Sequence, residues 1–216
     1  MIEHTDITIL GTKTLKNKLG FTDPQQLATA EADFTAFRLA ELRIAPIRGG
    51  FDSVHLQEIH HHVYQDLYDW AGELRRVDAG NRSASEVATS LNAVFDRLGR
   101  ENHLKGRSPE DWSYGASTYI YDIGTIQPFL AGNEVVLREF AAELARKNNL
   151  SLQWDRASEI GTRDVTRQFD QSEQSANIRR MVMLAMDTDP GRLRPSRGNV
   201  IERGIETLFS TGTLLL

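Results

Sequence analysis

The chain is dominated by helix-start signals that precede apolar residues spaced three or four positions apart. At Asp23-Pro24 and Ser108-Pro109, a capping side chain stands before a proline that suits the first helical turn. The apolar spacing that follows is the period of one helix face. We expect helices over residues 23–43, 52–72, 84–101, 108–126, 133–149 and 178–186, with another starting at Asp155 or Ser158. Since residues 73–78 hold the one candidate strand, the sequence predicts an all-α fold.

A change in composition near residue 189 divides the chain into two parts. Residues 1–188 are predicted to form one domain, and 40% of the 216 residues are hydrophobic, which can support a sizeable core. Residues 189–216 are rich in Arg, Gly and Pro. We expect this second part to be a tail with a short helix over 199–209.

Charge and composition exclude several classes of protein. A net charge of −5 argues against a primary nucleic-acid binder, and the lack of cysteine excludes disulfides and thiolate sites. No apolar run approaches 18 residues, so we expect no membrane span. The N-terminus also lacks the basic and apolar regions of a secretory signal. The chain is therefore predicted to be cytoplasmic, or to be delivered into another cell.

Residues 126–138 combine a tight turn with the start of a helix. Pro128, Phe129, Gly132 and Asn133 form the turn, and an apolar, helix-like run follows it. Asn133 is a residue type that caps helices well. We therefore expect a shaped loop that opens a helix at Asn133.

Three stretches of the chain resemble segments of Fic-domain proteins and occur in the same order as in that family. They are Leu15–Phe21, His60–Arg75 and Gln127–Arg138, and the last falls where the family signature H-P-F-D/E-x-G-N-G-R-x-x-R is expected. The resemblance spans roughly residues 12–186. It implies a helical fold whose signature loop opens a helix and binds nucleotide phosphates. Typical members transfer AMP from ATP to a hydroxyl of a target protein, and some relatives transfer other phosphate-containing groups.

The signature of this chain departs from the family pattern at its reactive positions. Gln127 stands in place of the histidine base, and losing a positioned base costs about 100- to 10,000-fold in rate. Leu130 replaces the acidic metal ligand and offers no oxygen to Mg²⁺, so we expect no metal site. Glu134 replaces a glycine, and Val135 replaces the first phosphate-binding arginine. The predicted nucleotide-binding residues are Gly132, Asn133, Glu134 and Arg138.

Glu134 admits two interpretations. It is either a substitute metal ligand shifted along the loop or an acid in the first helical turn, which the helix dipole favours. The flap that follows the A-G-x-x-R turn is also changed. Residues 79–85 are several positions shorter than the usual hairpin, so the sequence does not favour docking of a target by strand addition. No segment matches the inhibitory pattern S/T-x-x-x-E-G/N of many Fic proteins.

The run His60-His61-His62 suggests a metal site at first sight. Adjacent helical residues point about 100° apart, so the three rings cannot converge on one ion. His62 and Asp66 lie one turn apart, but two ligands make a weak site. We expect one packed histidine on an otherwise solvated helix face, and we expect Trp70, Trp112 and Trp154 to pack in the core.

Two functional hypotheses remain open. The first is a binding or regulatory pseudoenzyme with a protein partner, which includes a second copy of the chain, and with weak or absent nucleotide binding. The second is an active nucleotidyltransferase, using ATP with Mg²⁺ and non-standard residues such as Glu134 or Arg138. In both, the chain is effector- or toxin-like, with no nucleic-acid or membrane partner.

Overall fold

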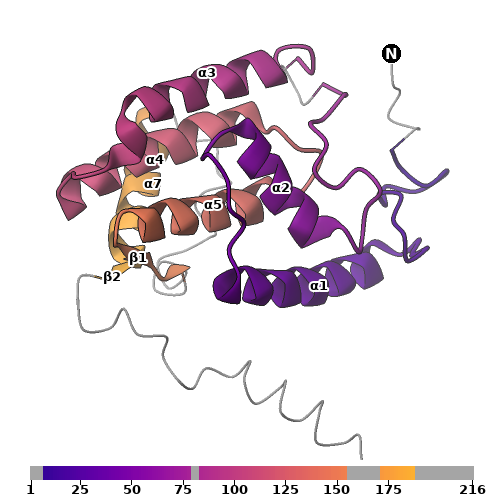
Figure 1. Cartoon of the computed structure of the whole chain (residues 1–216). Coiled ribbons are helices and arrows are strands. Elements are labelled where there is room, and N and C mark those ends of the chain that lie inside the picture. The colour runs from indigo at the N-terminus through magenta and orange to yellow at the C-terminus, as the bar shows by residue number, and fades with distance from the viewer. Residues whose placement is uncertain (1–6, 79–82, 155–170, 188–216) are drawn as a thin grey trace, which may run out of the picture.

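The computed structural model describes residues 7–78, 83–154 and 171–187, and these are almost entirely helical (Figure 1). The helices are α1 (Pro24–Ile44), α2 (Ser53–Tyr64), α3 (Val87–Arg100), the short η2 (Asn102–Leu104), α4 (Pro109–Ile126), α5 (Asn133–Lys147) and α7 (Gln171–Ala185). Two-residue strands β1 (Ser151–Leu152) and β2 (Met186–Asp187) pair antiparallel, with Ser151 opposite Asp187. The all-α prediction is confirmed.

Three predicted helix starts are confirmed by their hydrogen bonds. Asp23 accepts the backbone N–H of Gln25, and Asp52 accepts that of His55. The Ser108 hydroxyl accepts the N–H of Asp111, with Pro109 behind it in the first turn. In each case a local side chain satisfies one of the N–H groups that a helix leaves free at its start.

The helix predicted over 52–72 was too long, because α2 ends at Tyr64. Beyond it the chain continues as turns, in which the N–H groups of Leu67 and Tyr68 both bond to the Tyr64 carbonyl. Leu67 and Tyr68 lie in these turns, and their side chains are buried in the core. The apolar spacing in the sequence therefore continues past the end of the helix. Gly72 ends the segment with φ +88°, a conformation that glycine adopts without strain.

The strand predicted over 73–78 was wrong. The backbone N–H of Arg75 bonds to the Pro128 carbonyl in a loop, and no strand forms between residues 73 and 78. The start predicted at residue 84 was also early, because Ala84–Glu86 form a turn whose Ala84 carbonyl accepts the Val87 N–H. Asn133 does not cap α5; Gly132 stands at that position, and Asn133 is the first helical residue.

The last described helix, α7, begins at Gln171, earlier than predicted, and gives way to β2 at Met186. Four expectations lie wholly or partly outside the described residues. They are the short flap, whose residues 79–82 are not described, the helix starting at Asp155 or Ser158, the boundary near residue 189, and the helix over 199–209.

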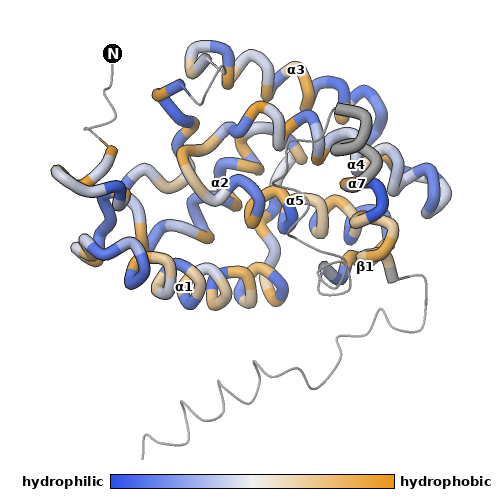
Figure 2. The backbone as a smooth tube through the Cα atoms, turned by 180° about the vertical axis from the view of Figure 1, so that it is seen from behind, coloured by the Kyte–Doolittle hydropathy of each residue, from blue (hydrophilic) through white to orange (hydrophobic). Residues whose placement is uncertain are grey.

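The core lies around α5, which packs against both α2 and α4, while α3 and α7 pack on α4 and α1 lies at the edge beside α2 (Figure 1). Trp112 is fully buried there, while Trp70 and Trp154 pack against the same core from partly buried positions. Apolar and polar residues alternate along the helices (Figure 2). This arrangement places the C-terminal ends of α2 and α4 and the start of α5 close together. In the described part of the chain, no helix is long and apolar enough to cross a membrane.

Candidate functional site

The segment from Gln127 to Asn133, here called the signature loop, links α4 to α5. Gln127 ends α4 in a left-handed conformation, with φ 48° and ψ 67°. The Arg75 guanidinium then holds this corner, because its Nε donates to the Gln127 carbonyl at 2.8 Å and Nη2 donates to the Ile126 carbonyl at 3.2 Å. Arg75 is only 6% exposed. A buried cation thus satisfies carbonyls that α4 leaves free at its end.

His60 on α2 fixes the middle of the loop. Its ring stacks on Phe129 with centroids 3.9 Å apart, and its Nε2 lies 3.2 Å from the Ala131 carbonyl. Its Nδ1 accepts the backbone N–H of Gly72 at 2.8 Å. Because Nδ1 is the acceptor, Nε2 carries the proton and donates to Ala131. Burial lowers the pKa of His60 to about 4, so the ring is neutral near pH 7.

Gly132 lies directly on the phenol ring of Tyr64. A Cβ atom at residue 132 would come within 2.3 Å of two ring carbons, and the backbone there has φ +74°. Both the close approach and the left-handed conformation therefore require glycine. Burial raises the pKa of the Tyr64 hydroxyl above its ordinary value. Tyr64 therefore stays neutral where it packs under Gly132.

Asn133 closes the loop on itself. Its Oδ1 accepts the backbone N–H of Phe129 at 2.9 Å, and its Nδ2 donates to the Phe129 carbonyl at 2.8 Å. Both ends of the side-chain amide are thus bound within the loop. The residue that was expected to cap α5 instead fixes the turn that precedes it.

None of the four residues that depart from the family signature is fully buried. The Gln127 and Glu134 side chains are exposed, and those of Leu130 and Val135 are half-buried. Among the described residues, no group of three or more His, Asp or Glu side chains could hold a metal ion. His62 and Asp66 have other partners. His62 Nε2 lies 3.2 Å from Glu41 Oε2, and the Asp66 carboxylate pairs with the Arg38 guanidinium.

Glu134 and Arg138 form an ion pair one turn apart on α5, with Oε1 and Nη2 separated by 2.5 Å. On its other side, the Arg138 guanidinium lies 5.8 Å from the centroid of the Trp154 ring. The Trp154 Nε1 also donates to the Arg138 carbonyl at 3.1 Å. The retained arginine is thus held by a carboxylate and an indole of its own chain.

The predicted nucleotide-binding residues come together at the start of α5, but their binding of nucleotide stays a prediction. Sequence reasoning missed Tyr64 beneath Gly132 and Trp154 beside Arg138. No local signal marks either, because α2 brings Tyr64 to the loop and the segment after β1 brings Trp154 to α5. The Glu134–Arg138 pair had a signal, since residues four apart on a helix are neighbours.

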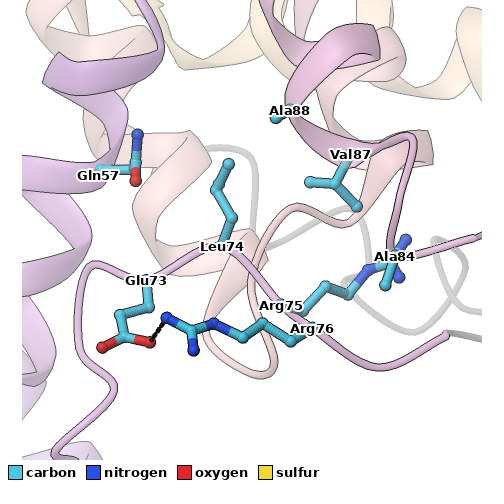
Figure 3. Close-up of a pocket in the computed structure, with 8 residues that line it drawn as sticks. All are labelled: Gln57, Glu73, Leu74, Arg75, Arg76, Ala84, Val87 and Ala88. Carbon is cyan, nitrogen blue, oxygen red and sulfur yellow. Dashed lines mark ion pairs between the residues drawn. The ribbon is translucent and has the colours of Figure 1, made fainter. Parts of the chain in front are cut away.

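A cleft of about 340 Å³ lies between residues 73–76 and the start of α3 (Figure 3). It is lined by Gln57 of α2, residues 73–76, Ala84 and the first turn of α3 at Val87 and Ala88. The Arg76 guanidinium pairs with the Glu73 carboxylate at 3.1 Å. The volume is near the lower end of the range for small-molecule sites, about 300–1,000 Å³.

Comparisons with known proteins identify the family of this chain. Residues 50–145 match the Fic/DOC family. The chain is 33% identical over 150 residues to protein adenylyltransferase VbhT of Bartonella schoenbuchensis, covering 67% of this chain and 31% of VbhT. It is 32% identical to the probable protein adenylyltransferase Fic of Salmonella typhimurium, covering 67% of this chain and 74% of that protein.

The fold also matches solved structures. The crystal structure of BepC, a VirB-translocated effector of Bartonella tribocorum with bound AMPPNP, superposes with a TM-score of 0.77 at 19% identity. That match covers 84% of this chain and 96% of BepC. This chain spans about a third of VbhT but most of the shorter Salmonella relative. On the family match, the identity and the shared fold, the chain belongs to the Fic/DOC family.

Proposed function

We propose that this chain is a Fic-fold binding or regulatory module that has lost adenylyl transfer. One observation carries the proposal. The backbone of the signature loop is held by His60, Arg75 and Asn133, whereas Gln127 and Leu130 stand where a base and a metal ligand are required. The fold of the loop is therefore kept without the groups that perform the reaction.

The missing base has no substitute in the nearest histidine. Transfer to a hydroxyl requires a group that accepts its proton, and the Gln127 amide has no useful basicity. His60 contacts the loop, but it is fully buried and both its ring nitrogens are bound to backbone groups. Its lone pair on Nδ1 faces the Gly72 N–H, so it cannot take a proton from a substrate hydroxyl.

The residues present do not fit the Mg²⁺ that the family resemblance implies. Leu130 has no oxygen, and the Asn133 side-chain oxygen is bound to the Phe129 N–H. The Glu134 carboxylate is paired with Arg138. A hard cation would need oxygen ligands that these side chains do not offer freely. This also argues against Glu134 as a substitute metal ligand.

We propose a protein partner for this chain, with weak or absent nucleotide binding. BepC and several other structural relatives are named VirB-translocated effector proteins. By analogy, we place this chain in the cytoplasm or in a cell into which it is delivered. A second copy of the chain is one partner of this class.

The rival function is nucleotidyl transfer with non-standard residues. It is favoured by the names of the relatives, which are protein adenylyltransferases at 32–33% identity. Under this function Arg138 would still bind phosphate, and its pair with Glu134 would open when substrate binds.

Labelling of lysate proteins separates the two. The purified chain is mixed with lysate, Mg²⁺ or Mn²⁺, and labelled ATP, GTP, UTP or CDP-choline, with VbhT as the positive control. We expect no labelled protein. Robust labelling that disappears in an Arg138→Ala variant would establish the rival function.

A further inference from the structure

We infer that Glu134 is an internal substitute for phosphate on Arg138, and that this single residue lowers the affinity of the start of α5 for polyanions. The inference rests on the proposed function, because it concerns what the retained loop can bind. It assigns to Glu134 a defined role in selecting ligands. Neither a capping acid nor a metal ligand would have that role.

The first support is the geometry of the pair. The two residues lie one turn apart, and a Glu four positions before a cation is the favoured orientation on a helix. The 2.5 Å separation of Oε1 and Nη2 is a direct, charge-assisted contact. The Arg138 side chain is 30% exposed and the Glu134 side chain 64% exposed, so the pair stands at the surface that a ligand would approach.

The second support is the place of the carboxylate on the helix. Glu134 is in the first turn of α5, where free N–H groups and the helix dipole attract anions. The Glu134 carboxylate therefore pairs with Arg138 and places a negative charge in the same turn whose dipole would attract a phosphate. A phosphate bound there would also lie beside the like charge of Glu134.

The third support is the restraint on Arg138 from its other side. Trp154 lies against the guanidinium and donates to the Arg138 carbonyl. The arginine is thereby held in reach of Glu134. Removing the carboxylate would leave a positioned guanidinium at the start of α5, which is ready to bind another anion.

Titration calorimetry of an isosteric variant tests the inference. Glu134→Gln removes the negative charge and keeps the shape of the side chain. The probes are inorganic tripolyphosphate, ADP and adenosine, each without metal. We expect both phosphate-bearing probes to bind at least about tenfold more tightly than to the natural chain, and adenosine to show no gain.

Two further variants make the test specific. Glu101→Gln is the matched control, because Glu101 also pairs with an arginine, Arg107, at 2.5 Å. That pair flanks the start of α4, and the 18 residues of α4 separate it from the signature loop. The Glu101→Gln variant makes the same change in net charge as Glu134→Gln, and we expect it to show no gain in affinity for tripolyphosphate or ADP. Adding Arg138→Ala to Glu134→Gln should abolish the gain.

The outcomes distinguish this inference from the proposed function. Unchanged affinity in a folded Glu134→Gln variant, or a gain that survives Arg138→Ala, overturns the inference and leaves the proposed function standing. A gain that Glu101→Gln reproduces also overturns it. If Glu134→Gln gains affinity and the natural chain labels proteins with AMP, the inference holds and the proposed function fails.

Discussion

The Nδ1 atom of His60 accepts the backbone N–H of Gly72 at 2.8 Å, while the opposite ring nitrogen faces the Ala131 carbonyl at 3.2 Å. One neutral ring thus joins the turn before the flap to the signature loop. A protonated ring would have no acceptor for the Gly72 N–H. The integrity of the loop is therefore coupled to the charge state of a residue that has no catalytic part.

This coupling predicts a loss of stability in mild acid. Burial holds the folded-state pKa of His60 at about 4, below the ordinary 6.5, so the unfolded chain binds the proton more tightly between these values. The contribution is fully present above pH 6.5 and is lost as the pH falls toward 4. From this group alone, the free energy of unfolding should drop by about 2 kcal/mol between pH 7 and pH 5.

Urea unfolding at the two pH values measures this effect. In His60→Gln, that part of the pH dependence should vanish. His61→Gln is the control, because it removes an exposed neighbouring histidine. Equal pH dependence in the natural chain and in His60→Gln would show that His60 does not carry the effect.

Gly132→Ala is expected to destabilise the protein more than a glycine substitution that causes strain alone. Gly106 supplies the comparison, since it has φ +80° but no atom within 4 Å of an added Cβ. Gly106→Ala should therefore cost about 1–2 kcal/mol of unfolding free energy, from its left-handed backbone. Gly132→Ala adds a clash with Tyr64, so we expect a total of about 3 kcal/mol or more.

Thermal and urea unfolding of both alanine variants give the comparison. Similar losses would mean that the loop moves away from Tyr64 at little cost. In that case the close approach at Gly132 would not be a constraint on the loop.

Arg75→Met is expected to destabilise the protein by about 3 kcal/mol, because it removes a buried guanidinium that donates to the Gln127 and Ile126 carbonyls at the end of α4. Arg76→Met is the matched control. The Arg76 side chain is 68% exposed and pairs with Glu73. Exposed pairs of this kind contribute about 0–1 kcal/mol to the free energy of unfolding. Urea unfolding measures both, and equal losses would refute a special role for Arg75.

Local signals explain which parts of the fold could be predicted. Asp23, Asp52 and Ser108 cap helices through bonds to residues two or three positions ahead, so a short stretch of sequence contains both partners. The end of α2 was missed because Leu67 continues the apolar spacing from a turn. The bonds that shape the signature loop join residues 71 and 52 positions apart, and no periodic pattern encodes them. Asn133 was assigned a local cap because its true partner, Phe129, precedes the helix.

Reverting the four replaced residues should restore part of the family's nucleotide binding. The variant combines Gln127→His, Leu130→Glu, Glu134→Gly and Val135→Arg. Because His60, Arg75 and Asn133 already hold the loop, the reverted side chains should enter an existing framework. We expect the natural chain to bind ATP weakly or not at all by calorimetry, and the reverted chain to bind it with Mg²⁺ at least about tenfold more tightly. The control is the triple variant that keeps Glu134. We expect its gain in ATP affinity to be smaller than that of the quadruple variant, because the Glu134 carboxylate still pairs with Arg138. A folded quadruple variant with no gain would mean that the pocket around the loop has been remodelled beyond these four positions.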